Sequence, residues 1–356
     1  MRPAAKLRAM ATTAAVVGAT GYTGAELVRL LHGHPHIELG PLVGSSTAGR
    51  TIADVLPSLA GVVAGSIEGF DAASIARRAD VAFCALPHGA SAPTVAALRE
   101  AGVVVFDLSA DFRLRELEVY TQWYGAHGAP ELLSSAVYGL VELHREALRR
   151  AELVAVPGCY PTASILALAP LLSAGLVEPE GLVVDAKSGV SGAGRKPGAA
   201  THFAEVAEGL RAYKAGGLHR HTPEIEQALG AVAGRSVTLT FTPHLVPMSR
   251  GILVTAYAAA RPGVTAERCT DAARRLYEGS PSVVVRDAGT HPDTLWVRGS
   301  NRAQLAYHLD GRTGRVIAMS VIDNLVKGAA GQAVQGANVR FGFPEGAGLQ
   351  ALAAWP

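Results

Sequence analysis

Residues 14–31 read AAVVGATGYTGAELVRLL and decide the fold, because they join a short apolar strand to a helix through three glycines. Gly18 allows a tight turn, Gly21 lets the backbone approach a pyrophosphate, and Gly24 lets helix and strand pack closely. The helix N-terminus adds free N–H groups and the positive end of a dipole. The spacing is G-x-x-G-x-x-G, not the commoner G-x-G-x-x-G. We therefore predict a dinucleotide-binding loop made of Gly18, Thr20, Gly21, Tyr22, Thr23 and Gly24.

Outward from this loop, apolar strands alternate with helices. Strands are expected at 14–17, 37–43, 81–86, 103–108 and 153–156, with helices at 26–31 and 91–101. This alternation is typical of a parallel, doubly wound sheet, so the fold class is α/β with an N-terminal Rossmann-type domain. Later strands, expected at 182–186, 237–242, 252–258, 283–285, 304–309 and 315–321, are joined mostly by turns or single helices.

The later pattern predicts a mixed sheet in a second, α+β domain. An amphipathic stretch at 322–334 is expected to be a helix that returns to the first domain. We therefore predict a dinucleotide-binding domain from residues 1–158 and 324–356, and a catalytic and oligomerisation domain from residues 159–323.

The end of the second expected strand indicates which dinucleotide binds. An NAD enzyme usually ends this strand with Asp or Glu, whose carboxylate holds the ribose 2′-hydroxyl. Here the strand is followed by Ser45 and Ser46, with Arg50 nearby. Hydroxyls and a guanidinium accommodate a 2′-phosphate, which a carboxylate would repel. The pattern favours NADP(H), although an ordinary Ser/Thr turn would use the same residues.

Composition excludes several other classes of protein. The 356 residues include 32 Lys+Arg and 30 Asp+Glu, so the net charge of +2 offers no footprint for nucleic acid or an anionic membrane. No apolar run reaches the roughly 18 residues of a membrane-spanning helix. Three cysteines are too few for a disulfide framework, which favours a cytoplasmic location. Residues 1–12 are interpreted as an extension and not a signal peptide, because the apolar stretch after them runs into the glycine loop.

One cysteine stands in a context that favours reactivity. Cys159 lies between a strand end and a helix opened by Pro161. Unpaired N–H groups at a helix start are expected to lower the pKa of its thiol and make it a nucleophile toward acyl carbon. A buried structural cysteine is the alternative. Cys84, in an apolar strand, and Cys269, in a helix, are expected to be inert.

A nucleophile of this kind needs a proton carrier, and two histidines are candidates. His219 and His221 precede a helix expected to be capped by Thr222, with Pro223 at its first position. Histidine titrates near neutral pH and suits acid–base catalysis. The alternatives are two metal ligands or polar surface. The segment supplies no third and fourth ligand, so no metal is expected.

Two further segments carry candidate anion-binding groups. The loop 188–196, SGVSGAGRK, follows a strand, and its small residues expose backbone donors before two cations. Arg113 ends the segment 109–113 at the carboxyl edge of a parallel strand, where such sheets bind ligands. Arg113 is therefore a candidate clamp for a carboxylate or a phosphate.

Seven segments together resemble the N-acetyl-gamma-glutamyl-phosphate reductase family over almost the whole chain. They are GATGYTGAELVRLL from Gly18, LPHG at 86–89, DLSADFR at 107–113, PGCYPTA at 157–163, SGVSGAGR at 188–195, HRHTPEI at 219–225 and PHLVPMSRGIL at 243–253. That family is similar in fold to the aspartate-semialdehyde and glyceraldehyde-3-phosphate dehydrogenases.

The resemblance implies an NADPH-dependent reduction of a small-molecule acyl phosphate to an aldehyde, a step of arginine biosynthesis. It makes Cys159 the nucleophile and His219, or failing that His221, the acid–base group. It assigns substrate contacts to Arg113, Ser188, Ser191 and Arg195, and cofactor contacts to Pro87, Ser188, Gly189, Gly192 and Asn324. It also suggests a homodimer or a homotetramer.

Two rival functions are weighed against this one. The same chemistry could act on a carrier-linked aminoadipyl or glutamyl phosphate in lysine biosynthesis, but an acidic carrier calls for a concentrated basic surface, which a net charge of +2 does not indicate. A non-catalytic dinucleotide sensor would have no need for Cys159 at a helix start together with two histidines.

Overall fold

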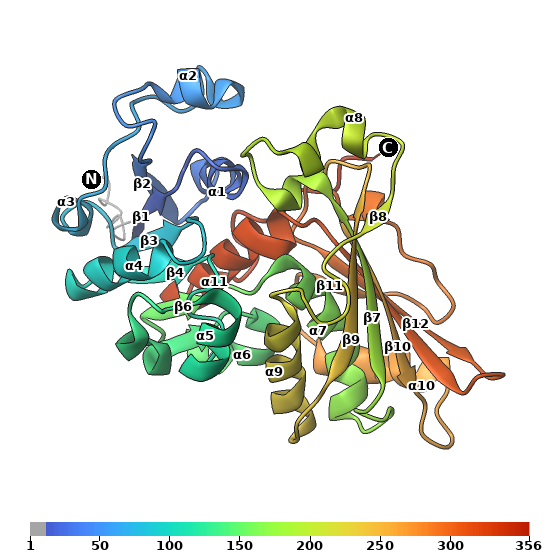
Figure 1. The fold of residues 1–356 in the computed structure, drawn as a ribbon. Coiled ribbons are helices and arrows are strands. Elements are labelled where there is room, and N and C mark those ends of the chain that lie inside the picture. Colours follow the sequence, from blue (N-terminus) through green and yellow to red (C-terminus); the bar gives the residue numbers. More distant parts are fainter. Residues whose placement is uncertain (1–11, 356) are drawn as a thin grey trace, which may run out of the picture.

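The computed structural model of the chain describes residues 12–355. The expectation for the N-terminal extension therefore lies outside the described residues, except for Thr12. The described chain forms two sheets with helices packed on them, and the last helix, α11 (Gly331–Phe341), lies beside the first sheet (Figure 1).

The first sheet is six-stranded and parallel, in the order β2-β1-β3-β4-β6-β5. Its strands are β1 Thr12–Val17, β2 Ile37–Val43, β3 Val81–Cys84, β4 Val104–Asp107, β5 Ala136–Tyr138 and β6 Leu153–Ala155. Its helices are α1 Tyr22–His32, α2 Ile52–Val55, α3 Ala72–Ala76, α4 Ser91–Glu100, α5 Leu117–Tyr124 and α6 Val141–Leu148, with 3₁₀ turns at Pro57–Leu59 and Pro130–Ser135.

Both faces of this sheet are buried, as its near-continuous apolar strands predict. Phe83 and Phe106 stack at 5.4 Å between ring centroids on one face, where α1, α6 and the C-terminal helix pack. Ala82 and Val105, one residue along, face the other side, where α3 and α4 pack. Successive side chains of a strand point to opposite faces, so each strand serves two cores.

The second sheet is mixed and seven-stranded, in the order β11-β12-β13-β10-β7-β9-β8. Its strands are β7 Leu182–Gly189, β8 Arg211–Ala212, β9 Leu239–Val246, β10 Ile252–Ala259, β11 Val283–Val285, β12 Ala303–Asp310 and β13 Arg315–Ile322. The pairs β7–β9 and β11–β12 are parallel and the others antiparallel. Helical segments accompany it: α7 Cys159–Ser173, α8 Phe203–Val206, α9 Thr222–Ala233, α10 Ala266–Leu276, and 3₁₀ turns at Val190–Ala193, Ala199–Thr201 and Thr294–Trp296.

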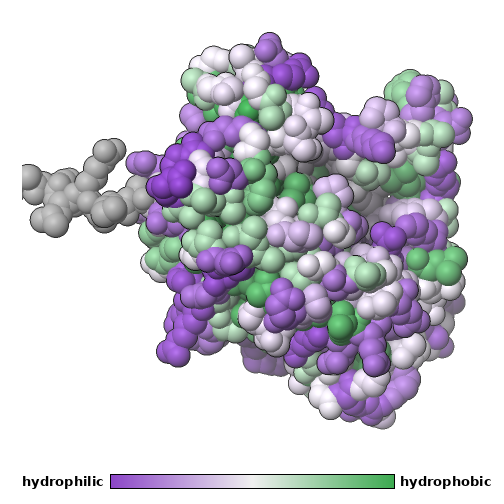
Figure 2. All heavy atoms as spheres, turned by 60° about the vertical axis from the view of Figure 1, so that its left-hand side comes forward, coloured by the Kyte–Doolittle hydropathy of each residue, from purple (hydrophilic) through white to green (hydrophobic). Residues whose placement is uncertain are grey.

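The second sheet buries one face along β10, whereas on β12 residues of both faces, such as Leu305 and Ala306, are buried. Along β10, residues 252, 254, 256 and 258 are buried in a core shared with α7, α9 and α10, and the alternate residues are half-exposed. This period of two is typical of a sheet that keeps one face free of its own chain. Figure 2 shows polar and apolar side chains interspersed over one side of the molecule. Among the described residues, no helix is long and apolar enough to cross a membrane.

The C-terminal helix differs from its expected position. It was expected at 322–334, but Ile322 ends β13, a π-helical turn spans Val326–Ala330, and α11 runs over Gly331–Phe341. The side chain of Asp323 accepts N–H groups from Leu325 (2.8 Å) and Val326 (3.0 Å), so a turn, not a helix, follows the strand. Helix α11 then packs on α1 and α6 beside the first sheet.

Two other local expectations were wrong by a few residues. Helix α7 begins at Cys159 itself and not at Pro161. Helix α9 begins at Thr222, so His221 occupies the N-cap position and the expected Thr222 cap does not form. The Thr222 hydroxyl is buried without a hydrogen-bond partner among the described residues. The short strands β5 and β8 have too few residues to produce a periodic signal in the sequence.

Candidate active site

The glycine loop packs as tightly as its sequence suggests. Gly18 has φ +85°, and a Cβ there would lie 2.4 Å from the carbonyl oxygen of Ala85. A Cβ on Gly24 would lie 2.2 Å from the carbonyl oxygen of Gly18. A Cβ on Gly21 would meet nothing closer than 3.8 Å. Gly18 and Gly24 are therefore needed for packing, whereas Gly21 borders open space at the start of α1.

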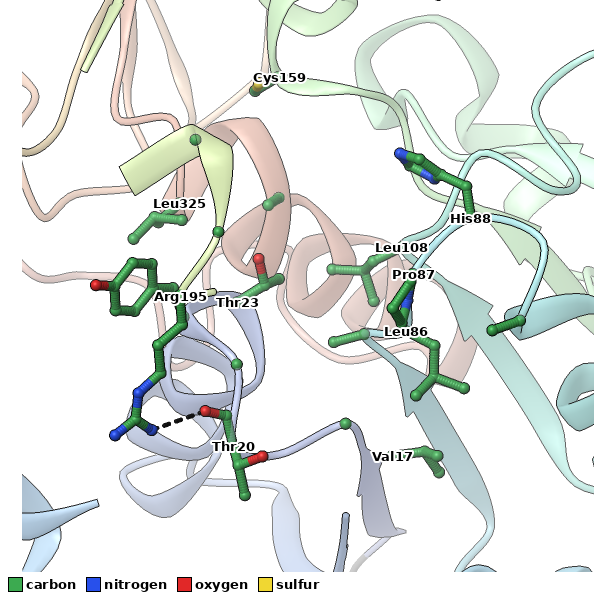
Figure 3. A pocket seen from close by; sticks show the side chains of 18 of the residues that line it. Val17, Thr20, Thr23, Leu86, Pro87, His88, Leu108, Cys159, Arg195 and Leu325 are labelled. Atoms are coloured by element: carbon green, nitrogen blue, oxygen red, sulfur yellow. Dashed lines mark hydrogen bonds between the residues drawn. The ribbon is translucent and has the colours of Figure 1, made fainter. Parts of the chain in front are cut away.

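That open space is a cleft of about 790 Å³ at the carboxyl ends of β1, β3 and β4 (Figure 3). Of the predicted cofactor residues, its lining includes Gly18, Thr20, Gly21, Tyr22, Thr23, Ser45, Pro87, Gly192 and Asn324. No Asp or Glu is among its lining residues. Gly24 packs behind the loop, and Ser46 is exposed beyond the cleft.

A smaller hollow of about 310 Å³ shares Thr20 and Arg195 with the cleft, and there the structure brings two predicted arginines together. Its lining is Thr20, Thr47, Arg50, Asp54, Val55 and Arg195. Arg195, expected among the substrate contacts, donates to the carbonyl oxygens of Thr20 (2.9 Å) and Val55 (3.2 Å). In Figure 3 it points toward Thr20 and away from Cys159. Arg195 thus lies on the side of the glycine loop.

The rest of the loop after β7 is held against Asn324. The Asn324 side chain accepts the N–H of Gly251 (2.8 Å) and donates to the Ser191 hydroxyl (2.9 Å), which fixes the orientation of its amide. Ser188 is buried, and its hydroxyl donates to the Gly189 carbonyl oxygen (3.0 Å). Ser191 lines the large cleft, whereas Ser188 and Gly189 line a second pocket.

This second pocket, of about 420 Å³, meets the large cleft at Cys159. Cys159, His88, Gly192 and His221 line both spaces. Cys159 is the only partly exposed cysteine of the described residues, since Cys84 and Cys269 are fully buried. The sulfur therefore lies where a ligand in either space could reach it.

The pKa of the Cys159 thiol is shifted upward, opposite to the expected direction. Burial raises this pKa to about 11, and it outweighs the lowering by the Arg113 charge and by the N–H of Tyr160. The expected lowering at the helix start is present, but desolvation of the thiolate is larger. Cys159 is therefore a protonated thiol at neutral pH in the protein alone.

Glu224 supports the backbone beside Cys159, and the sequence analysis assigned it no role. Its buried carboxylate accepts the N–H of Gly158 and the O–H of Tyr138, each at 2.8 Å on Oε1. Its Oε2 lies 3.4 Å from Nη1 of Arg113. Glu224 stands within the HRHTPEI segment, five residues after His219, but nothing in the sequence alone places it against Gly158.

Arg113 is buried, and the nitrogens of its guanidinium group are largely occupied by hydrogen bonds within the protein. Nε donates to the Val156 carbonyl oxygen and Nη2 to that of Leu108, both at 2.8 Å. It lines the large cleft, as does its neighbour in space His221. The fixed guanidinium places a positive charge near the sulfur, where it lowers the pKa of Cys159 against the burial effect.

The two histidines have different surroundings. The Nδ1 atom of His219 accepts the backbone N–H of His221 (3.1 Å), so the neutral His219 ring carries its proton on Nε2. Burial lowers the pKa of His219 to about 4, with smaller contributions from Lys214 and Arg220. Burial also lowers the pKa of His221 well below its usual range. Both rings are therefore neutral at pH 7, and His219 is a hydrogen-bond donor at Nε2.

His221 packs over the turn before Cys159. A Cβ on Gly158 would lie 2.6 Å from its Nε2, so a larger residue at 158 would displace this ring. The Nδ1 atom of His221 is buried without a partner among the described residues. No cluster of three or more His, Cys, Asp or Glu in residues 12–355 could hold a metal ion.

Comparisons with known proteins agree in sequence and in fold. A family model described as semialdehyde dehydrogenase, NAD binding domain, matches residues 13–151, and one described as semialdehyde dehydrogenase, dimerisation domain, matches residues 159–324. The chain is 50% identical to an N-acetyl-gamma-glutamyl-phosphate reductase of Pelobacter propionicus over 96% of this chain and 99% of that one. It is 52% identical to the enzyme of the same name from Symbiobacterium thermophilum over 94% and 96%.

Solved structures with a similar fold have other names. Aspartate semialdehyde dehydrogenase II from Vibrio cholerae, in a complex with ASA, superposes with a TM-score of 0.70 at 19% identity, covering 93% of this chain and 98% of that one. Aspartate semialdehyde dehydrogenase with NADP from Candida albicans gives a TM-score of 0.68 at 15% identity, covering 92% and 98%. Likeness at this identity supports the two-sheet architecture.

Proposed function

The chain belongs to the N-acetyl-gamma-glutamyl-phosphate reductase family, and on that premise we propose that it reduces N-acetyl-gamma-glutamyl phosphate to N-acetyl-L-glutamate 5-semialdehyde with NADPH, in L-arginine biosynthesis. The observation that carries the proposal is the position of Cys159. Its partly exposed thiol lies where the cleft of the glycine loop meets a second pocket that contains two histidines.

The residues of the cleft fit NADP(H). Gly18 and Gly24 leave no room for a Cβ and Gly21 leaves open space, as a loop around a pyrophosphate requires. No carboxylate lines the large cleft, and the adjoining hollow offers Arg50, Arg195 and Thr47 to a 2′-phosphate. Asp54 also lines that hollow, with its carboxylate bonded to the Thr51 hydroxyl. When bound, NADPH supplies the hydride that brings the acyl group to the oxidation level of an aldehyde.

In the proposed mechanism the Cys159 sulfur attacks the acyl carbon of the substrate. The carbon–sulfur bond forms, the carbon–oxygen bond to phosphate breaks, and the thiol proton leaves on the departing phosphate, which gives a thioester on the enzyme. After reduction the substrate oxygen takes up a proton from solvent by way of a histidine. The thiohemiacetal then collapses: the carbon–sulfur bond breaks, the aldehyde is released, and this proton passes to the sulfur, which restores the thiol. A thiol with a pKa of about 11 is a poor nucleophile alone, so transfer of its proton accompanies the attack.

The surrounding residues have distinct proposed roles. The Nε2–H of His219 would donate to the substrate oxygen as negative charge develops on it, since its other ring nitrogen already accepts a backbone N–H. This favours His219 over His221, whose ring packs against Gly158. The buried Arg113 guanidinium would stabilise the phosphate as it leaves. Ser188 and Ser191 are proposed to contact the substrate, and Gly189, Gly192 and Asn324 the nicotinamide end of the cofactor.

The reaction is tested most simply in reverse. Purified protein is supplied with N-acetylglutamate semialdehyde, phosphate and NADP, and the absorbance of NADPH is followed. We expect turnover that depends on phosphate and is lost in Cys159→Ala, while that variant still binds NADPH. A preference for aspartate semialdehyde, or full activity without the thiol, would refute the proposal.

We also propose how the protein assembles and where in the cell it acts. We propose a homodimer or homotetramer formed through the half-exposed face of the second sheet, in the region 159–324 that matches a dimerisation domain. The division into residues 1–158 with 324–356, and 159–323, is kept as the proposed domain boundary. Light scattering with size-exclusion chromatography tests the assembly. A cytoplasmic location is proposed because the Cys159 thiol must stay reduced.

A further inference from the structure

The second pocket carries positive charge that neither the proposed mechanism nor the cofactor uses. Three cations are among its lining residues, Arg211, Lys214 and Arg220, and no Asp or Glu is. None of the three forms an ion pair with a carboxylate among the described residues. A pocket with this lining attracts an anionic group, and the mechanism places only the phosphate, beside the buried Arg113.

One of these cations, Arg220, packs on an aromatic ring, and another, Lys214, has an unusual backbone conformation. The guanidinium of Arg220 lies 5.1 Å from the centre of the Tyr124 ring, and the Tyr124 hydroxyl donates to the Arg220 carbonyl oxygen (3.1 Å). Lys214 has φ +45°, a left-handed conformation that a lysine rarely adopts. Strained residues of this kind concentrate at ligand-binding sites. The third cation, Arg211, is bonded to the carbonyl oxygen of Ala200 and ties two loops together.

The positive charges of Lys214 and Arg220 affect the proposed acid–base group, His219. Both lower the pKa of His219, after the larger effect of burial, so both lie close enough to act on it. His219 and Cys159 line the same pocket. In the proposed substrate, four carbon–carbon bonds separate the reacting carbonyl carbon from the free α-carboxylate carbon, a span of roughly 5 Å. An acyl group that extends from Cys159 into this pocket would therefore bring its α-carboxylate among the lining residues.

We propose that Arg220 and Lys214 form the subsite for the α-carboxylate of the substrate, which they hold while Arg113 faces the phosphate. This inference rests on the proposed function and names the part of the substrate that this site selects. A guanidinium and an ammonium in the lining of one pocket match a carboxylate. The two anionic ends of the substrate are thus bound by different cations, so an acyl phosphate without the α-carboxylate would be a poor substrate.

The test measures the reverse reaction. In that direction the aldehyde and phosphate are two separate substrates, so the KM of each can be measured independently. We would compare wild type with Arg220→Gln and Lys214→Asn, the latter because asparagine tolerates a left-handed backbone. Each KM is measured separately for N-acetylglutamate semialdehyde, for its α-methyl ester and for phosphate. Arg312→Gln, on the exposed turn between β12 and β13, removes one positive charge far from the pocket and serves as the matched control.

We expect each of the Arg220 and Lys214 variants to raise the KM of the aldehyde about tenfold to a hundredfold, the usual cost of losing a charged hydrogen bond. The KM of phosphate should stay within about twofold, and the α-methyl ester should be used equally by wild type and variants. Arg312→Gln should match wild type throughout.

Three outcomes would overturn the assignment. A raised KM for phosphate with an unchanged aldehyde KM would mean that these cations bind the phosphate. An equal loss on aldehyde and ester, in both variants, would mean a structural role. Wild-type values in both variants would mean that these cations bind nothing in the reaction. Absence of turnover in wild type would instead refute the proposed function and not this subsite alone.

Discussion

Replacing Glu224 by Gln should have two opposite effects, a less stable protein and a more reactive Cys159. Glu224 is 1% exposed and holds three groups, the N–H of Gly158, the O–H of Tyr138 and the Arg113 guanidinium. The Gln carbonyl can keep the first two hydrogen bonds at the Oε1 position. Its NH₂ then faces Arg113, so the buried cation loses its carboxylate.

The cost follows from the geometry of that ion pair. Two unit charges 3.4 Å apart attract each other by about 5 kcal/mol at an effective dielectric constant of about 20. Removing one partner of a buried pair costs about 3–5 kcal/mol in measured cases. Since two hydrogen bonds are kept, we expect a loss of about 3 kcal/mol in the free energy of unfolding.

The sulfur should respond in the other direction. The charge of Glu224 is among the groups that raise the pKa of Cys159, so its removal lowers that pKa. Each unit of lowering multiplies the thiolate fraction by about ten below the pKa. We therefore expect Glu224→Gln to be alkylated faster than wild type by iodoacetamide at the same pH.

Urea unfolding and alkylation followed by mass spectrometry measure the two effects. Glu226→Gln is the matched control, because it makes the same change on α9 at a carboxylate that accepts the N–H of Leu239. The control should lose less than about 1 kcal/mol and leave alkylation unchanged. Slower alkylation in Glu224→Gln, or a stability equal to that of the control, would contradict the assigned contacts.

Three further predictions use the same site. Gly18→Ala should weaken NADP(H) binding at least tenfold in a fluorescence titration, because its Cβ would lie 2.4 Å from the Ala85 carbonyl oxygen; unchanged affinity would contradict the packing. Alkylation of Cys159 should rise about tenfold per pH unit between about pH 7 and about pH 10, since its pKa is about 11; a plateau reached below about pH 9 would contradict this value. Gly328→Ala should lower kcat while NADP(H) still binds, because its Cβ would lie 2.8 Å from the Cβ of Cys159; a kcat equal to that of wild type would show that the helix start can move freely.

The sequence predicts the first sheet well because its signals are local. Three glycines between a strand and a helix, and apolar runs buried on both sides, are readable without knowing what lies next to them in space. The start of the last helix was misplaced because the side chain of Asp323 caps a turn after β13, and apolar periodicity does not record such a bond.

The candidate site was predictable in its residue types more than in its contacts. Cys159 at a helix start is a local feature, but the sign of its pKa depends on burial by distant segments. The resemblance assigned Arg195 to the substrate, but the sequence does not show that its side chain, which lines the large cleft, also donates to the carbonyl oxygens of Thr20 and Val55. Glu224 acts through contacts that no spacing in the sequence encodes. Only the fold places Lys214 in the pocket that His219 also lines.

The most direct test is the mass of the enzyme after it meets freshly prepared N-acetyl-gamma-glutamyl phosphate in the absence of NADPH. The sulfur should be acylated and should stay acylated without a hydride donor, so the intact protein should gain the mass of one N-acetylglutamyl group. This group should map to the peptide of Cys159. It should be released as aldehyde when NADPH is added. An unmodified protein that nevertheless produces aldehyde once NADPH is present, or an acyl group on any other residue, would contradict covalent catalysis by this thiol.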